Sequence, residues 1–230
     1  MVSLNLCVRN IQNFFVRQIL LTLTRKLAIL FSGNGSNMQN LIETLHQKVF
    51  QDSDKQNIKL EVAITLCNNP SAHGIKRTQD LGIPCVIIPH KDFSSRLAFD
   101  EAMIKVLDSH HIDLCILAGF MRILTPSFTQ HFPTINIHPS LLPAHKGAHA
   151  IADTFNARDS YGGVSVHWVN EELDGGALIT QKSVALESTD TLESFEHKIH
   201  TLEYELYPIA VLQALNLDAT SLQDSPQETK

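Results

Sequence analysis

An amide, an imidazole and a hydroxyl occur within five residues at positions 136–140. The residues just before them have the composition of a short strand. Because a strand is pleated, Asn136 and His138 project to the same side, while Ile137 turns the other way into the core. Pro139 cannot donate to a sheet ladder and ends the strand, so the two polar side chains stand at its carboxyl end. Open α/β sheets bind their ligands at that edge, and the spacing therefore predicts a functional site here.

Asp174 would complete a catalytic set with Asn136 and His138. An amide donor can stabilise an oxyanion, an imidazole can give or take a proton, and a carboxylate can sustain the protonated imidazole. Such a set needs no nucleophilic side chain. The same residues also fit a hydrogen-bonded strand end and a simple Asp-Gly-Gly turn, and local sequence does not decide whether positions 138 and 174 meet in space.

A metal site is one alternative, with four histidines close enough in sequence to serve as ligands: His138, His145, His149 and His167. The pattern is weak, because His145 is not followed by the glutamate of an H-E-x-x-H motif and no cysteine lies nearby. A hydrolase nucleophile at Ser140 is a further alternative. It is disfavoured because a proline and a leucine replace the glycines that flank the serine in a G-x-S-x-G elbow.

A glycine-containing loop follows the apolar run at 26–31, and apolar residues at helical spacing follow the loop. Ser36 with Gln39 fits a capping box, which predicts a helix that starts near Ser36 and leaves free N–H groups on Gly35, Ser36 and Asn37. Such a helix start favours an anion. A single phosphate matches best, because the third glycine of a dinucleotide fingerprint and the Gly-Lys-Ser/Thr of a P-loop are both missing. An ordinary tight turn explains the glycines equally well.

Hydrophobic periodicity makes strands and helices alternate through the chain. The expected strands cover residues 26–31, 60–66, 84–88, 113–118, 133–137, 162–169 and 177–186. The expected helices start near 36 and cover 72–81, 94–110, 147–159 and 190–215, the last of them capped by Asp190 and Glu193. The alternation predicts a Rossmann-like, parallel sheet with helices on both faces.

Residues 119–124 combine one cation, Arg122, with bulky apolar groups directly after a strand. This mixture is suited to binding a flat heterocycle that has a polar edge. A core-lining crossover with Arg122 at its rim explains the same residues.

Composition limits the classes of protein that the chain can belong to. With 230 residues, of which 43% are hydrophobic, it is long enough for one large domain. A net charge of −6 disfavours nucleic-acid binding and favours small-molecule partners. No apolar run reaches the length of a membrane span, and four widely separated cysteines suggest reduced thiols in the cytoplasm. We expect a disordered or helical extension at 1–24, one domain at 25–217 and a flexible polar tail at 218–230.

Five motifs, in order between about Lys26 and Leu215, resemble the phosphoribosylglycinamide formyltransferase family of purine biosynthesis. The motifs are Ser32–Asn37 (SGNGSN), Leu117–Leu124 (LAGFMRIL), Asn136–Pro143 (NIHPSLLP), Gly163–His167 (GVSVH) and Glu172–Gly176 (ELDGG). Five motifs in register are far more specific as a set than any one of them.

The resemblance implies a three-layer α/β/α Rossmann-like fold whose mostly parallel, mixed sheet has seven strands, one of them antiparallel. It also implies transfer of a formyl group from 10-formyltetrahydrofolate to the amine of phosphoribosylglycinamide, without a metal or a covalent intermediate. The amine would attack the formyl carbon, with Asn136 and protonated His138 stabilising the oxyanion and Asp174 sustaining the imidazolium and assisting proton movement. Such an enzyme would be a monomer or homodimer, with no membrane or nucleic-acid partner.

Residue by residue, the resemblance assigns catalysis to Asn136, His138 and Asp174. It assigns the substrate phosphate to Gly35, Ser36 and Asn37, and binding of the glycinamide ribonucleotide also to Glu203. Contacts with the folate are assigned to Arg96, Met121, Arg122, Ile123, Leu124, Asn136, Asn170, Glu171, Glu172 and Leu173.

The chain departs from the family at its first 24 residues and in the loop Pro143–Gly147, which lacks an aromatic residue common there. The strand-end motif and the distal aspartate also resemble methionyl-tRNA formyltransferase and formyltetrahydrofolate deformylase. We expect a further C-terminal domain and a basic surface in the first, and an N-terminal regulatory domain in the second, which 24 residues cannot make. A non-catalytic folate- or phosphate-binding module would not need a paired acid and imidazole.

Overall fold

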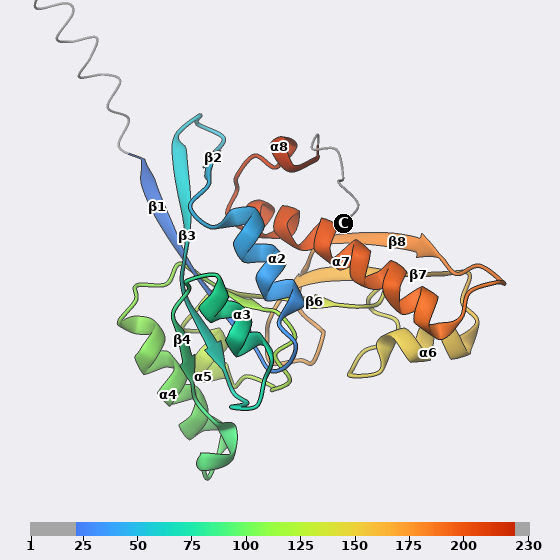
Figure 1. Ribbon diagram of the computed structural model, residues 1–230, viewed down its shortest axis with the longest axis horizontal. Coiled ribbons are helices and arrows are strands. Elements are labelled where there is room, and N and C mark those ends of the chain that lie inside the picture. The colour runs from blue at the N-terminus through green and yellow to red at the C-terminus, as the bar shows by residue number, and fades with distance from the viewer. Residues whose placement is uncertain (1–21, 224–230) are drawn as a thin grey trace, which may run out of the picture.

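Strands and helices alternate along residues 22–223, the part of the chain that the computed structural model describes (Figure 1). The strands are β1 (Leu23–Phe31), β2 (Val49–Gln51), β3 (Asn57–Cys67), β4 (Cys85–Ile87), β5 (Leu114–Leu117), β6 (Thr134–His138), β7 (Tyr161–Trp168) and β8 (Leu178–Ala185). The helices are α2 (Ser36–Leu45), α3 (Gly74–Asp80), α4 (Arg96–Asp108), α5 (Pro126–Thr129), α6 (Ala150–Ala157), α7 (Leu192–Ala214) and α8 (Thr220–Gln223), with a 3₁₀ turn, η1, at His90–Asp92. Each strand expected from the periodicity is present, within a few residues of its predicted bounds.

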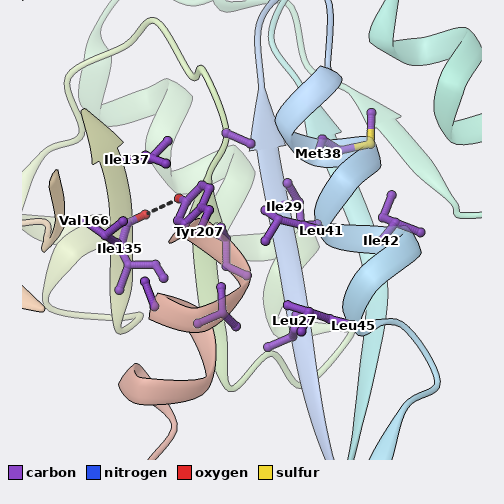
Figure 2. Packing of buried hydrophobic residues seen from close by; sticks show 14 of the residues in the cluster. Leu27, Ile29, Met38, Leu41, Ile42, Leu45, Ile135, Ile137, Val166 and Tyr207 are labelled. Carbon is purple, nitrogen blue, oxygen red and sulfur yellow. Dashed lines mark hydrogen bonds between the residues drawn. The ribbon is translucent and has the colours of Figure 1, made fainter. Parts of the chain in front are cut away.

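Strand β1 is buried on both faces and separates the two halves of the core. Leu27, Ile29 and Phe31 pack with α2 and α7, and Figure 2 shows the first two against the apolar side of α2. Ala28 and Leu30 point the other way and pack with α4 and α5. All five side chains are fully buried, which explains the continuous apolar run in the sequence. The fold therefore has three layers, with the sheet between two sets of helices.

The sheet is mixed and mostly parallel, as expected. Seven strands follow one another in the order β2-β3-β1-β5-β6-β7-β8, and β4 pairs with β3 as an eighth. The pairs that β1 forms with β3 and β5 are parallel, as are β5 with β6 and β3 with β4. β7 is antiparallel to both of its neighbours. A second antiparallel strand, the three-residue β2 against β3, is not predicted from the sequence, because it is too short to show a strand period.

The ends of the described chain add residues to the predicted domain. β1 begins at Leu23, so the last two residues of the expected extension belong to the sheet. Residues 1–21 lie outside the described part, and the prediction for them stays a prediction. Four residues of the expected polar tail form α8, and residues 224–230 again lie outside the described part.

The predicted capping box at the start of α2 is wrong. The helix does begin at Ser36, but its N-cap is Gly35, and no side chain caps it. Gly35 has a φ of 77°, a left-handed conformation that already turns the chain into the helix, so Ser36 is the first helical residue. The amide of Gln39 instead donates to Glu43 at 2.8 Å, and its oxygen accepts a hydrogen bond from Arg77.

The predicted caps of α7 are also wrong by one residue each. Thr191 and Ser194 form a reciprocal capping box at the start of this helix. Asp190 accepts hydrogen bonds from Ser194 and from Lys198, a full two turns along the helix. The sequence offers several adjacent capping residues here; Thr191 faces the helix end, and Asp190 pairs with Lys198 instead.

Tyr207 of α7 ties together the two strands that end at the candidate site. Its side chain is fully buried, and its hydroxyl donates to the Leu117 carbonyl of β5 at 2.8 Å. The Ile135 carbonyl of β6 lies 3.5 Å from the same hydroxyl (Figure 2). Burial raises the pKa of Tyr207 well above its usual value, so the hydroxyl remains a donor. The helix thereby fixes the spacing of β5 and β6 beneath the site.

Tyr207→Phe should lower the free energy of unfolding by about 1–3 kcal/mol, because the buried Leu117 carbonyl loses its donor. Urea denaturation at neutral pH measures the change. Tyr161→Phe is the matched control, since Tyr161 is 59% exposed and its replacement should cost less than about 0.5 kcal/mol. Equal changes in the two variants would show that the buried hydroxyl contributes nothing specific.

Candidate active site

The two polar residues of β6 point away from the core that α7 covers. Ile135 and Ile137 pack with Tyr207 in that core, so the alternation of the strand turns Asn136 and His138 to the opposite face (Figure 2). Both residues line a cleft, and His138 is only 5% exposed. The structure places the pair on one face at the strand end, as the two-residue spacing predicts.

Asp174 reaches the same cleft from the turn that follows β7. Its backbone is left-handed, with a φ of 50°, a conformation that aspartate tolerates better than most residues. The Asp174 Oδ2 atom lies 3.5 Å from His138 Nδ1, and the side chain is 6% exposed. The Gly147 N–H donates to the same oxygen at 3.0 Å. Two positions that the sequence leaves unconnected therefore form one buried acid–imidazole pair.

The Asp174 carboxyl is held in its ionised form. Burial raises its pKa, but the His167 imidazole, the Gly147 N–H and the charge on His138 together outweigh burial. The pKa of Asp174 therefore lies below its usual value. At neutral pH the cleft contains a buried negative charge that accepts from the Gly147 N–H and has two imidazoles beside it.

The second nitrogen of His138 is also engaged. Its Nε2 atom lies 2.9 Å from the main-chain carbonyl oxygen of His145. A carbonyl and a carboxylate can only accept, so both ring nitrogens of His138 face acceptors. The doubly protonated ring satisfies both, and this geometry suits an imidazolium that stabilises developing negative charge.

His167 of β7 belongs to the site, although the sequence analysis gives it no role there except in the metal alternative. It is 2% exposed, and its Nε2 lies 3.6 Å from Asp174 Oδ1 and 3.3 Å from Asn136 Nδ2. Its Nδ1 lies 2.9 Å from the Trp168 carbonyl, which only accepts, so this nitrogen carries a proton. The antiparallel register places His167 opposite Asn136. The period-two pattern of the strand could have shown which face His167 lies on. It could not have shown that His167 pairs with Asn136 across the sheet.

The cleft has a volume of about 400 Å³ and contains most of the residues expected to contact the folate. Its wall includes Met121, Arg122, Ile123, Leu124, Asn136, His138, Asn170, Glu172, Leu173 and Asp174. Three apolar residues are about half-exposed or more at its surface, namely Met121, Ile123 and Leu173. Arg96 and Glu171 are not part of this wall. Arg96 is the first residue of α4, one position after the Ser95 N-cap.

The predicted phosphate loop lies at the start of α2. A side chain at Gly35 would be strained by its positive φ, and its Cβ would meet the Gly74 Cα atom at 2.8 Å. Arg77 of α3 holds the loop from outside, since its Nε donates to the Asn34 carbonyl at 3.0 Å. The first-turn N–H groups of α2, on Ser36 and Asn37, have no partner within the helix. This is the geometry expected for an anion site.

The phosphate loop is linked to α7 on one side and to the cleft on the other. Asn37 Nδ2 donates to Glu203 Oε2 at 3.0 Å, and Glu203 is 5% exposed. Ser32, at the start of the loop, accepts from the Met121 N–H through its hydroxyl at 2.8 Å, and its own N–H donates to the Gly119 carbonyl. The loop, Glu203 and the cleft wall therefore share one edge of the sheet.

The competing chemistries find less support in the geometry. Within residues 22–223, no group of three or more His, Cys, Asp or Glu side chains is arranged to hold a metal ion. Ser140 is fully buried, and its hydroxyl donates to the Ala144 carbonyl at 2.6 Å, so it is not presented as a nucleophile. None of the helices in the described residues has the length and apolar character needed to span a bilayer.

The family profile described as formyl transferase matches residues 25–211. The match includes both the phosphate loop and the Asn136–His138–Asp174 cleft. The chain therefore belongs to the formyl transferase family.

Similar proteins of matching length are phosphoribosylglycinamide formyltransferases, which confirms the resemblance of the five motifs. The protein of this name from Haemophilus influenzae is 38% identical over 189 residues, which cover 81% of this chain and 85% of that protein. The one from Bacillus subtilis is 36% identical over 84% of this chain and 96% of its own length. The crystal structure of phosphoribosylglycinamide formyltransferase from Campylobacter jejuni has a TM-score of 0.80 at 44% identity, covering 84% of this chain and 99% of that one.

Asp174→Asn should lower the free energy of unfolding at neutral pH by about 1–3 kcal/mol, because two buried imidazoles lose their charged partner. The pKa of Asp174 is depressed by folding, so its contribution is present above the unfolded value of about 3.9 and is lost as the pH falls through the folded value. The difference from the wild type should therefore shrink in urea titrations below about pH 4. Asp54→Asn, at an exposed loop position, should give a small difference with no such pH dependence.

Proposed function

We propose that this chain transfers the formyl group of 10-formyltetrahydrofolate to the amine of phosphoribosylglycinamide, a step of purine synthesis. The observation that carries the proposal is the meeting of Asn136, His138 and Asp174 in one cleft. The amino end of α2, which is suited to a phosphate, lies at the same edge of the sheet. The names of the similar proteins support this choice of substrate.

The cleft has the properties that a reduced pterin requires. Its volume lies within the range of about 300–1,000 Å³ that small-molecule sites occupy. Met121, Ile123 and Leu173 offer apolar walls to a flat ring, while Asn170 and Glu172 offer polar edges. A ring held there would bring its formyl group to Asn136 and His138, because these two residues line the same cleft.

The catalytic set would act on charge that develops at the formyl oxygen. The substrate amine forms a bond to the formyl carbon, and the electrons of the carbonyl move to its oxygen. Asn136 would donate to that oxyanion, and the positive charge of the His138 imidazolium would stabilise it, since both N–H groups of the ring already face acceptors. Collapse of the tetrahedral species breaks the bond to the folate nitrogen, which takes up the proton lost by the amine. Asp174 stays ionised, sustains the imidazolium and assists this proton transfer through water.

The phosphate of the acceptor would bind at the amino end of α2. The N–H groups of Gly35, Ser36 and Asn37 and the positive end of the helix dipole favour a dianion there. Glu203 contacts Asn37 and is nearly buried, so it can bind the hydroxyl or amine groups of the same substrate. The compartment that we propose is the cytoplasm, consistent with free cysteines at positions 67, 85 and 115.

One assay tests the choice of acceptor directly. The purified protein is incubated with 10-formyltetrahydrofolate and, in turn, glycinamide ribonucleotide, water alone and methionyl-tRNA. Formyl transfer to the ribonucleotide is the expected result. Faster hydrolysis in water alone, or transfer to the tRNA, would replace the proposal with one of the related activities.

His138→Ala and Asp174→Asn should each reduce kcat by a factor of about 10²–10⁴, the usual contribution of a positioned acid–base group. Affinity for the folate should change little, because the walls of the cleft remain. Steady-state kinetics and fluorescence titration with a folate analogue measure the two quantities. An unchanged kcat in either variant would contradict the catalytic role of the residue replaced.

Asn37→Ala should raise the KM for glycinamide ribonucleotide about tenfold, because Glu203 loses the side-chain hydrogen bond that holds it against the phosphate loop. The KM for the folate should stay within about twofold. Asn40→Ala is the matched control, because Asn40 lies one turn further along α2 and its amide donates to the Tyr204 carbonyl, away from the phosphate loop. An equal rise in both KM values would count against the phosphate role.

A further inference from the structure

The loop at residues 143–149, here called the clamp loop, contacts both members of the acid–imidazole pair through its main chain. The His145 carbonyl accepts from His138 Nε2 at 2.9 Å. The Gly147 N–H donates to Asp174 Oδ2 at 3.0 Å. The backbone of this loop therefore sets the orientation of the His138 ring and the position of the Asp174 carboxylate.

The segment that leads into the clamp loop is fixed by buried hydrogen bonds. Ser165 of β7 accepts from the Leu142 N–H and donates to the Ser140 carbonyl. Gln181 of β8 donates to the Leu142 carbonyl at 2.9 Å. Ser140 and Ser165 are both fully buried. These contacts hold the chain at Ser140 and Leu142, shortly before the residues that touch the catalytic pair.

The following residues are held by two side-chain contacts instead. His145 Nε2 donates to Asp159 Oδ2, just beyond the carboxyl end of α6, at 2.6 Å. Lys146 Nζ donates to Glu172 Oε1, in the turn that carries Asp174, at 2.7 Å. The His145 side chain is 23% exposed, whereas Glu172 is 68% exposed and its pair is weakened by solvent. The His145–Asp159 pair is therefore the stronger of the two anchors.

His145 also needs an anchor because of its backbone. Its φ is 50°, in the left-handed region that a non-glycine residue occupies only when its surroundings hold it there. The imidazole–carboxylate bond fixes the side chain of the same residue whose carbonyl faces His138. Release of that bond would let the peptide relax and would turn the carbonyl away from His138 Nε2.

We propose that His145 and Asp159 are positioning residues for formyl transfer. They act through the backbone of the clamp loop and touch neither substrate. The inference rests on the proposed function, because it assigns the two residues to the geometry of His138 and Asp174. Misplacement of a catalytic group by about 1 Å can cost about 10²-fold in rate, so partial loss of this anchor should cost about tenfold in kcat.

The test compares His145→Gln, Asp159→Asn and the double variant with the wild type. Each single variant should lower kcat about tenfold and leave both KM values within about twofold, since the walls of the cleft and the phosphate loop are untouched. The double variant should lose no more than either single one, because the two residues act as one unit. Asp159 is 42% exposed, so its replacement should leave the thermal unfolding temperature nearly unchanged.

His131→Gln is the matched control. His131 pairs with Asp108 at 2.7 Å, is 44% exposed, and neither residue lines the cleft. Its kcat should equal that of the wild type. An unchanged kcat in Asp159→Asn, an equal loss in the control, or additive losses in the double variant would overturn the inference. A wild-type protein that forms no formylated ribonucleotide would instead overturn the proposed function, which keeps the two failures distinct.

Discussion

A buried carboxylate between two imidazoles is the interaction on which this site depends. Asp174 lies 3.5 Å from His138 Nδ1 and 3.6 Å from His167 Nε2, and all three side chains are nearly inaccessible to solvent. A charge in such a place is costly unless it is paired and hydrogen-bonded. The relative positions of three segments must therefore be fixed: the strand that carries His138, the strand that carries His167 and the turn that carries Asp174. Much of the surrounding structure serves to fix these positions.

Helix α7 and strand β7 fix the relative positions of these segments. Tyr207 of α7 reaches through the core to the carbonyl of Leu117 and lies near that of Ile135, so the helix sets the spacing of β5 and β6 from below. β7 then lies antiparallel to β6 and places His167 opposite Asn136. The site thus stands where the sheet changes from parallel to antiparallel. Main-chain groups of His145 and Gly147 complete the arrangement through hydrogen bonds with His138 and Asp174.

Local patterns predicted the parts of this protein that depend on local physics. The unbroken apolar run of β1 indicated a strand buried on both faces, and the two-residue spacing of Asn136 and His138 indicated a shared face. The caps were less predictable, because neighbouring residues offered similar hydrogen bonds. At α2 the left-handed Gly35 replaced the expected serine cap. At α7 Thr191 caps the helix, while Asp190 pairs with Lys198, eight residues away.

The sequence by itself determined the order of the seven expected strands and five expected helices, the helix start suited to an anion, and the strand end that presents an amide and an imidazole. These features follow from side-chain periodicity and from the conformations open to glycine and proline, which act over a few residues. Tertiary structure alone decided that Asp174 meets His138, that His167 joins them, and that the clamp loop holds both partners. Those contacts join residues distant in sequence, and they exist only once strand register and turn geometry have brought the residues together.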